Sequence, residues 1–317
     1  MNKMSQTKTK TKQKPFATVQ VDLDGLWTNL GYYGHEAPIS PDPVLMSSIP
    51  RFIKLFDKYN IKATFFTIAK DLEDPEKAEL IRQLHSSGHE IANHTYDHPF
   101  GFRSLPIEIQ KNQIQKAHQL IKKTIGVDPV GFKAPGYDAN AATINLLETL
   151  NYQYDSSVIP TWSYPLILKT YAFLTRTKSP SHGPKAIWGL AKNRIYSPNS
   201  KKEWKETVRE RKIKEFPCPV APIFRFPIHA TFALKLGSPF IIPTLWLTKL
   251  LCQDINYEFH AADLSDTVDD KRLAHLKGHP VELRINRIET VLKILTRTHE
   301  IIPSKEYINQ KSKNKQE

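Results

Sequence analysis

The chain has 317 residues, of which 40% are hydrophobic and 24% charged, enough to build one large core. Its two cysteines, Cys218 and Cys252, are too few for a disulfide framework and lack metal-ligand spacing, which predicts a reducing compartment. No run of about 18 apolar residues occurs, which argues against a membrane-spanning helix, so we expect any membrane contact to be peripheral. Residues 1–14 are basic with no apolar stretch behind them, which is typical of a disordered arm rather than a secretory signal. We therefore expect a cytoplasmic protein.

The net charge of +13 is unevenly distributed along the chain. Residues 1–14 hold five lysines and no acid, and residues 305–317 hold four lysines against two glutamates. Residues 161–215 hold thirteen Lys/Arg against four Glu, so the remainder of the chain is slightly acidic. This distribution predicts an anion-binding surface within 161–215. Because no nucleic-acid-binding motif accompanies the basic residues, we expect no nucleic-acid partner.

From Pro15 onward, short β-rich runs alternate with helix-patterned stretches, which is typical of β-α units around a parallel sheet or barrel. The helical pattern is clearest at 45–56, 76–86 and 106–125. The predicted strands are 16–23, 63–68, 90–93, 130–134, 152–155, 213–217, 257–261 and 301–302.

The regular alternation fails between residues 156 and 212, where a segment rich in Pro, Trp, Tyr and Lys replaces it. A second apolar stretch follows at 224–251. We therefore expect one barrel domain at 15–304, with a basic and aromatic insertion at about 158–212 after the fourth or fifth strand. Residues 305–317 are expected to form a disordered basic tail.

Three side chains at predicted strand ends suit a divalent metal. Asp24 follows the first strand in VDLDG, and His94 and His98 follow the third in HTYDH. Two histidines four residues apart lie on one face of a helical turn, so both rings can reach one ion, and a carboxylate supplies a third ligand. Three protein ligands leave positions open for water and substrate, as in catalytic sites. The carboxyl ends of barrel strands are also where the chemistry of such folds is found.

In its ordered motifs the chain resembles the polysaccharide deacetylase, or NodB-homology, family of carbohydrate esterases. VDLDG stands where the family commonly has TFDDG, and SGHEIANHTYDH contains the H(S/T)xxH pattern. FKAPGY corresponds to RxPxG, FHAADL to the late LxH histidine, and YDSS to the fourth strand. The resemblance covers roughly residues 16–157 and 213–303. It implies a distorted (β/α) barrel of about seven parallel strands.

The resemblance also implies roles for individual residues. Asp24, His94 and His98 would ligate the metal, Asp22 would be the base, and His260 would protonate the departing amine. Lys133, Pro135, Gly136 and Tyr137 would contact substrate, with Lys133 standing where the family usually has Arg. Asp22 and Asp24 are separated by Leu23, but alternate residues of a strand share a face, so both can point into one site. The alternative for Asp22 is a carboxylate that only orients a metal ligand or has a structural role. The alternatives for His260 and Lys133 are a structural strand residue and a solvated lysine. Asp155, Asp263 and His229 are further rim residues to which we assign no catalytic role.

The D-x-D form is similar to the branch that removes formyl or acetyl groups from undecaprenyl-phosphate-linked amino sugars. Together with the basic and aromatic segment 161–251, which suits headgroup and phosphate contact, it predicts a lipid-linked amino-sugar substrate in envelope or lipid A modification. The protein would then be peripheral at the inner face of the cytoplasmic membrane. The alternative for this segment is that its aromatics (Trp162, Tyr164, Tyr171, Trp188, Trp204 and Trp246) pack against the barrel.

Other functions and metals also fit the sequence. The alternative functions are a soluble oligosaccharide or peptidoglycan-type N-deacetylase, an allantoinase-like cyclic amidase, and an inactive deacetylase fold that binds glycan or lipid. The ligand set His₂Asp favours Zn²⁺ and is compatible with Mn²⁺, Co²⁺ or Ni²⁺. The sequence does not distinguish acetyl from formyl, and it leaves the oligomeric state open.

Overall fold

The computed structural model describes residues 14–32, 34–164, 166, 169–170, 183–252, 254–266 and 279–313. Most of the predicted arm at 1–14 lies outside these ranges, as does part of the predicted insertion, including Tyr171. The strands are β1 (Phe16–Asp22), β2 (Thr64–Thr67), β3 (Glu90–Asn93), β4 (Gly131–Phe132), β5 (Tyr154–Asp155), β6 (Lys214–Glu215), β7 (Ile255–His260) and β8 (Glu300–Ile301). The helices are α1 (Leu26–Tyr32), α2 (Pro43–Lys58), α3 (Pro75–Ser86), α4 (Ile107–Ile125), α5 (Ala141–Thr149), α7 (Ala230–Leu236), α8 (Ser238–Cys252), α9 (Val281–Thr298) and α10 (Ser304–Lys313).

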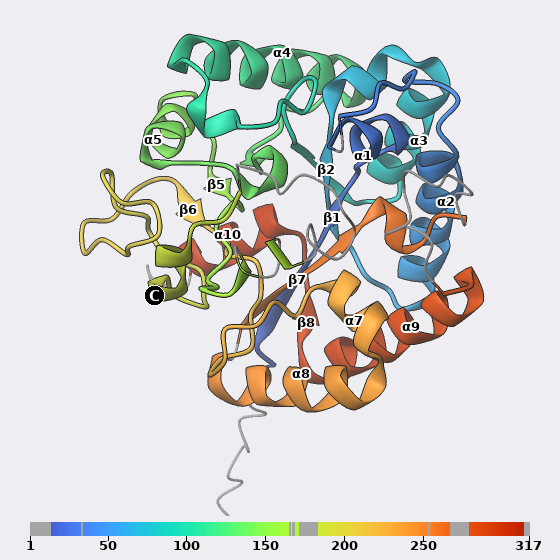
Figure 1. Ribbon diagram of the computed structural model, residues 1–317, viewed down its shortest axis with the longest axis vertical. Coiled ribbons are helices and arrows are strands. Elements are labelled where there is room, and N and C mark those ends of the chain that lie inside the picture. Colours follow the sequence, from blue (N-terminus) through green and yellow to red (C-terminus); the bar gives the residue numbers. More distant parts are fainter. Residues whose placement is uncertain are drawn as a thin grey trace, which may run out of the picture.

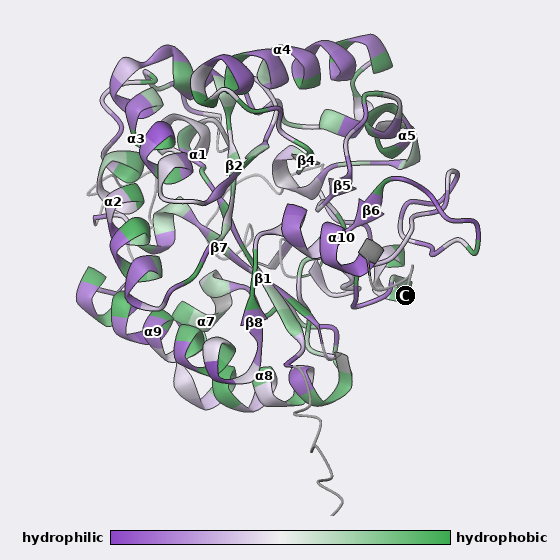
Figure 2. Ribbon diagram, turned by 180° about the vertical axis from the view of Figure 1, so that it is seen from behind, coloured by the Kyte–Doolittle hydropathy of each residue, from purple (hydrophilic) through white to green (hydrophobic). Residues whose placement is uncertain are grey.

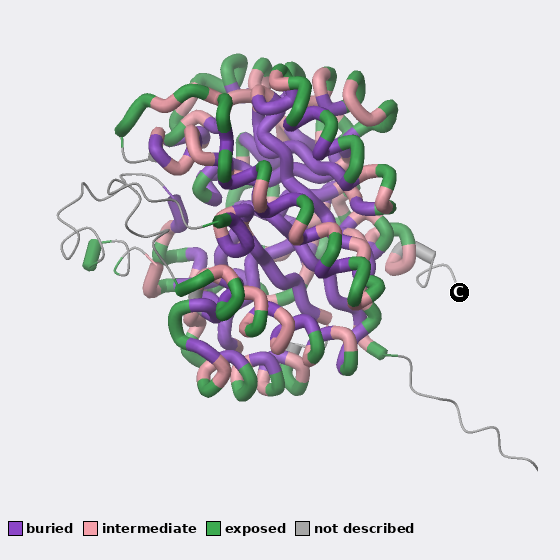
Figure 3. The backbone as a smooth tube through the Cα atoms, turned by 90° about the vertical axis from the view of Figure 1, so that its right-hand side faces the viewer, coloured by how far each residue is buried: buried purple, intermediate pink, exposed green. Residues whose placement is uncertain are grey.

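The strands form one parallel sheet in the order β6-β5-β4-β3-β2-β1-β7, and β8 pairs with the start of β1. The sheet curls, and the side chain of Asn256 on β7 donates a hydrogen bond to the Pro217 carbonyl beyond β6 at 3.3 Å. Helices surround the strands in Figure 1, and Figure 3 shows the buried strands at the centre of the molecule. The predicted α/β fold, a distorted barrel of about seven parallel strands, is confirmed.

The two faces of β1 explain how the barrel holds its site. All seven residues of FATVQVD are buried, as expected for a central strand of a parallel sheet covered on both sides. Ala17, Val19 and Val21 belong to the largest hydrophobic cluster, which includes residues of α2 and α9. The alternate residues face a polar interior, where Thr18 hydrogen-bonds Asn256 at 2.9 Å. This polar face ends at Asp22.

The long connection between β5 and β6 contains the predicted insertion, so the insertion follows the fifth strand. Part of it packs inward. Trp188 is fully buried and donates a hydrogen bond to Glu203 at 2.9 Å, and Trp204 packs against the same small cluster. Trp162 is instead 57% exposed. The aromatic residues of this region therefore divide between packing against the barrel and exposure at the surface.

The expectation of a disordered tail at 305–317 is wrong for residues 305–313, which form most of α10. One side of this helix packs against the rest of the domain. Tyr307 is buried against Phe16 and Phe216, with ring centroids 5.9 and 5.5 Å apart, and its hydroxyl donates to Asp254 at 2.8 Å. Lys311 pairs with the same carboxylate at 2.8 Å. The prediction of disorder was based on lysine content and could not include these tertiary contacts, which stabilise the helix. Among the described helices, none is long and apolar enough to cross a membrane.

Candidate active site

The parallel register brings four of the predicted site residues to one end of the sheet. Asp22 on β1 is aligned with His260 on β7, and Asn93, the residue before His94, is aligned with Phe132, the residue before Lys133. Asp24 lies two residues beyond the end of β1. The structure therefore gathers Asp22, Asp24, His94, Lys133 and His260 from β1, β3, β4 and β7.

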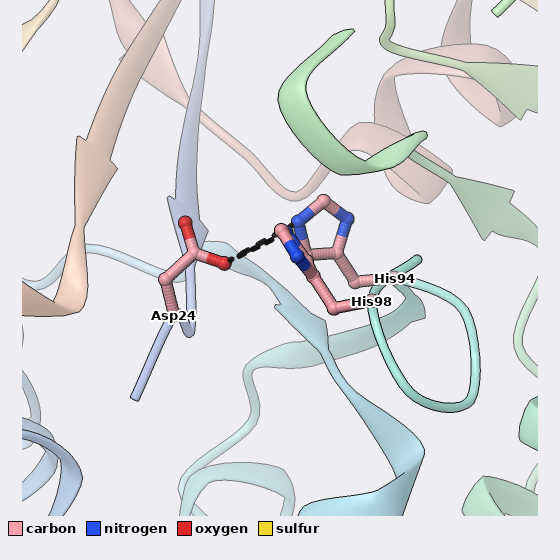
Figure 4. A group of neighbouring side chains, drawn as sticks. All are labelled: Asp24, His94 and His98. Carbon is pink, nitrogen blue, oxygen red and sulfur yellow. Dashed lines mark ion pairs between the residues drawn. The ribbon is translucent and has the colours of Figure 1, made fainter. Parts of the chain in front are cut away.

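Asp24, His94 and His98 converge as the sequence predicted (Figure 4). Asp24 Oδ1 lies 3.7 Å from His94 Nε2 and 3.3 Å from His98 Nε2. The three donor atoms all lie within 4.8 Å of one another. Both imidazoles are buried, and the Asp24 side chain is 22% exposed, so the group opens toward solvent on the carboxylate side.

This donor set fits a divalent metal. Ligand bonds of about 2.1 Å in tetrahedral geometry place neighbouring donor atoms about 3.4 Å apart, close to the observed separations. The second ring nitrogen of His94, Nδ1, lies 2.7 Å from the carbonyl oxygen of Lys133. A proton on Nδ1 is donated to that carbonyl, which fixes the ring and leaves Nε2 free to bind a metal. Asp24 Oδ1 is buried and has no hydrogen-bond partner among the described residues. A metal would satisfy this buried oxygen.

The two histidines are not held on a helical turn, which corrects the geometry expected from their spacing. Residues 94–98 form a non-helical loop in which Thr95 (φ 68°) and His98 (φ 53°) have left-handed backbone conformations. Two hydrogen bonds hold this loop: Asn93 Oδ1 accepts from the Thr95 amide at 2.8 Å, and Thr95 Oγ1 accepts from the His98 amide at 3.1 Å. A β-branched residue at positive φ costs about 1–3 kcal/mol, which the fold tolerates where it shapes a site.

Lys133 is fully buried and contacts acids, so its alternative as a solvated lysine is wrong, whereas its contact with substrate stays a prediction. Its ammonium lies 2.7 Å from Asp22 Oδ1 and 3.4 Å from Glu258 Oε2. Asp22, Glu258 and His260 form a second group with metal-ligand spacing. The single ammonium offsets one of the two carboxylate charges, and a protonated His260 would offset the other. Lys133 thus provides the positive charge of the family's Arg, but it holds Asp22 through one point contact rather than a bidentate fork.

Glu258 belongs to the candidate site, although our sequence analysis missed it. Its carboxylate is fully buried between Lys133 and the hydroxyl of Tyr137, which donates to it, and it lies 3.7 Å from His260 Nε2. Tyr137 OH is also 3.3 Å from His260 Nε2. A signal was present in the sequence, because residue 258 is two positions before His260 and strand side chains alternate, so both point to the same face.

Charges in this network set the pKa values of its members. Burial raises the pKa of the Asp22 carboxyl, and the Lys133 ammonium opposes that rise without cancelling it. Burial opposes protonation of His260, but the carboxylates of Glu258, Asp22 and Asp263 outweigh it and raise its pKa. The Lys133 and His260 charges overcome the effect of burial and lower the pKa of Glu258 to about 2. The charged Glu258 carboxylate beside His260 therefore favours the protonated form of this imidazole.

The remaining predicted substrate residues lie on a short turn after β4, Pro135–Tyr137. Pro135 and Tyr137 are buried, whereas Gly136 is exposed with a φ of 57°, a conformation that suits glycine. Gly136 is thus the member of this turn that can face a substrate. Tyr137 lies inside the site, where its hydroxyl is next to His260. His229 also packs against His260, with ring centroids 5.7 Å apart, and burial lowers its pKa to about 3.

Asp155 and Glu215 form a separate carboxyl pair at the ends of β5 and β6. They are register partners and both are fully buried, so the charge of each carboxyl acts on the other. Ser157 donates to Asp155 through both its amide and its hydroxyl, and the Val158 amide donates to Glu215. Burial raises the pKa of Asp155 to about 6 and that of Glu215 well above its usual value. The pair therefore shares a proton and links two strands.

We expect the pair to make wild-type stability fall as pH rises. The folded state holds a proton that the unfolded chain releases near pH 4, so the stability present below pH 4 is lost progressively as pH rises from about 4 through the raised folded pKa values. Glu215→Gln, which cannot ionise, should be more stable than wild type by about 1 kcal/mol at pH 8. Urea unfolding of both proteins from pH 5 to 9 measures the difference. Parallel pH profiles for the two proteins would contradict the shared proton.

Comparisons with known proteins agree with this geometry. The family model of polysaccharide deacetylases matches residues 41–154, which include His94, His98 and the turn at 135–137. A Helicobacter pylori peptidoglycan deacetylase is 31% identical over 145 residues, 44% of this chain and 48% of that relative. A Sinorhizobium fredii chitooligosaccharide deacetylase is 37% identical over 59 residues, 19% of this chain and 25% of that relative. The matches thus span about half the length of these relatives or less.

Solved structures show a shared fold. A Mycobacterium smegmatis protein of the polysaccharide deacetylase type aligns with 96% of this chain and 93% of its own at a TM-score of 0.58 and 16% identity. A Thermococcus litoralis 4-alpha-glucanotransferase aligns with 93% of this chain and 38% of its own at a TM-score of 0.56 and 14% identity. Since the fold hosts both kinds of protein, it does not by itself indicate the activity. The sequence match is more specific, because residues 41–154 are similar to the polysaccharide deacetylase family.

Proposed function

We propose that the protein is a metal-dependent N-deacylase that removes an acetyl or formyl group from an amino sugar. The observation that carries this proposal is the convergence of Asp24, His94 and His98 beside Asp22 and His260. A divalent metal held by the three ligands would act as a Lewis acid toward the amide carbonyl and would lower the pKa of water. Zn²⁺ is the metal that this ligand set favours. An amide needs this help because its carbonyl is a poor electrophile.

The chain's own residues divide the proton transfers in this proposal. Asp22, held by the Lys133 ammonium at 2.7 Å, accepts the proton of the attacking water. His260, whose side chain is 22% exposed and whose pKa is raised, donates a proton to the departing nitrogen. Glu258 and Tyr137 orient His260 and stabilise its charged form. Without a proton donor, the amine would have to leave as an anion.

We further propose that the amino sugar is linked to a polyprenyl phosphate and that the protein binds it at the inner face of the cytoplasmic membrane. The basic excess of residues 161–215 and the exposed Trp162 and Trp246 support it, because such side chains suit phosphate and headgroup contact. The relatives favour a second acceptor, since their names specify peptidoglycan and chitooligosaccharide deacetylation. A glycan free of lipid is therefore the alternative substrate.

The two acceptors can be compared directly. Protein loaded with Zn²⁺, Mn²⁺ or Co²⁺ should release acetate or formate from a polyprenyl-phosphate-linked N-acyl amino sugar, and removal of the metal should stop the release. Turnover of N-acetyl chitooligosaccharides alone would assign the soluble or peptidoglycan-type function. Hydrolysis of a cyclic amide such as allantoin alone would contradict both. Absence of turnover with every substrate, despite a bound metal, would instead indicate a glycan-binding or lipid-binding protein.

His260→Gln should lower kcat by about a hundredfold while metal content stays at the wild-type level. The substitution removes the proton donor but leaves Asp24, His94 and His98 in place. Steady-state kinetics on the best substrate, together with metal analysis, tests this expectation. His118→Gln, on the outer helix α4, is a matched control that should retain activity. A kcat within twofold of wild type for His260→Gln would contradict the assigned role.

A further inference from the structure

Helix α8 presents apolar side chains on two opposite sides. Ile241 and Leu245 point into the core and are 3% exposed. On its outer side Ile242, Trp246 and Leu250 are 38%, 51% and 77% exposed. These three, with the exposed Pro239 and Pro243, recur at spacings of three and four residues and form a continuous strip along the helix, here called the α8 face. Figure 2 shows the α8 ribbon in green and pale colours along most of its length.

A helix at a protein surface ordinarily carries polar side chains on its exposed side, so an apolar outer strip indicates a partner. The strip continues past Leu250 to Leu251, which is 55% exposed. At its other end, Phe226 packs on Phe240 with ring centroids 5.7 Å apart. That contact joins α8 to the turn in which Ile223 and Phe224 are 65% and 73% exposed. The exposed apolar surface thus extends from α8 to the turn that contains Ile223 and Phe224.

The charges around the α8 face identify the kind of partner. Residues 216–253 contain no Asp or Glu, and their charged residues are Arg225, Lys235 and Lys249. Lys249 Nζ lies over the ring of Trp246, 5.0 Å from its centroid. A second copy of the chain would bring like charges together at this surface, whereas an anionic surface would neutralise them. Trp and Lys side chains with a bare apolar strip suit the headgroup region of a bilayer.

The length of α8 fits a position along the membrane surface rather than across it. Fifteen residues of helix extend about 22 Å, which is shorter than the hydrocarbon core of about 30 Å. The buried side of the helix is also occupied by the protein core, through Ile241 and Leu245. Only the outer strip is available to lipid, so the helix would enter the bilayer to the depth of its exposed side chains.

We propose that the α8 face is a docking surface for an anionic phospholipid bilayer, with Ile242, Trp246 and Leu250 inserted at the level of the headgroups. Lys249, whose ammonium lies over the Trp246 ring, then lies at the level of the lipid phosphates. This inference rests on the proposed function only in that a lipid-linked substrate gives the docking a purpose. Membrane binding and deacylation are separate measurements, so either can fail without the other.

The test is co-sedimentation of the whole protein with vesicles of phosphatidylcholine and phosphatidylglycerol, compared with vesicles of phosphatidylcholine alone. The wild type should bind the phosphatidylglycerol vesicles more strongly. Trp246→Glu/Leu250→Glu should weaken that binding about tenfold or more, because it removes the apolar area and adds like charge to the lipid. Ile107→Glu/Ile109→Glu is the matched control, since it makes the same charge change at exposed apolar positions of α4 and should bind as wild type does.

The remaining outcomes are also decisive. Both double variants should melt at the wild-type temperature and turn over a soluble N-acetyl oligosaccharide as the wild type does, because the four positions are exposed. Equal vesicle binding by wild type and Trp246→Glu/Leu250→Glu would overturn the proposal, as would absence of wild-type binding. A wild-type dimer that binds no vesicles and that the same variant dissociates would assign the α8 face to a second copy.

Discussion

His94→Ala is expected to remove the bound metal and to lower deacylase activity by about a thousandfold or more. The substitution deletes one of three ligands, the one whose Nδ1 is fixed by the Lys133 carbonyl at 2.7 Å. Metal assistance contributes several kcal/mol of transition-state stabilisation, and each 1.36 kcal/mol corresponds to a factor of about ten in rate. Metal content by elemental analysis should fall from about one ion per chain toward zero, in step with kcat/KM.

His85→Ala is the control for this experiment. His85 lies in the last turn of α3, is partly exposed, and makes no contact with the three ligands among the described interactions. Its replacement should leave metal content and activity at wild-type values. If His94→Ala retained both the metal and the activity, Asp24, His94 and His98 would not be the catalytic centre, and the proposed function would lose its main support.

Lys133→Met is expected to lower the free energy of unfolding by about 3–5 kcal/mol. The substitution keeps an unbranched chain of similar length but removes a fully buried ammonium, leaving Asp22 and Glu258 without their shared counter-ion. Breaking a buried ion pair by removing one partner is strongly destabilising, because the remaining charge is neither solvated nor paired. Urea unfolding near neutral pH measures the change.

A compensated variant separates loss of charge from loss of packing. Lys133→Met combined with Asp22→Asn and Glu258→Gln removes all three charges and should recover most of the lost stability, since the members of one network are not additive. Deacylase activity should stay low in the triple variant because Asp22 is the proposed base. A single-variant loss below about 1 kcal/mol would mean that the ammonium does not balance the two carboxylates.

Much of the architecture could be predicted from the sequence. Each predicted strand is present within a few residues, because alternating and buried apolar runs such as FATVQVD have few ways to be covered other than in a parallel sheet. The candidate metal ligands could also be predicted, since Asp24 and the two histidines lie within five residues of the ends of β1 and β3, and parallel strands end on the same side. Local pattern and chain order suffice for such features.

Other features depend on contacts between segments far apart in the chain. Spacing alone suggested a helical turn for His94 and His98, but they lie in a non-helical loop whose Tyr96 and Asp97 amides donate to the Gln113 side chain on α4. The composition of the lysine-rich end predicted disorder, yet the ring of Tyr307 packs against Phe16 and Phe216, which are far from it in the sequence. In both cases long-range packing and side-chain hydrogen bonds outweigh local propensity.

Sequence thus determined which residue types stand at the strand ends, and with them the fold class and the metal-type ligand set. Only the tertiary structure decided what surrounds those residues. Burial placed Lys133 between Asp22 and Glu258, since an ammonium removed from water must be paired. The tertiary structure also leaves one side of α8 apolar and exposed, which the hydrophobicity of the sequence alone does not reveal.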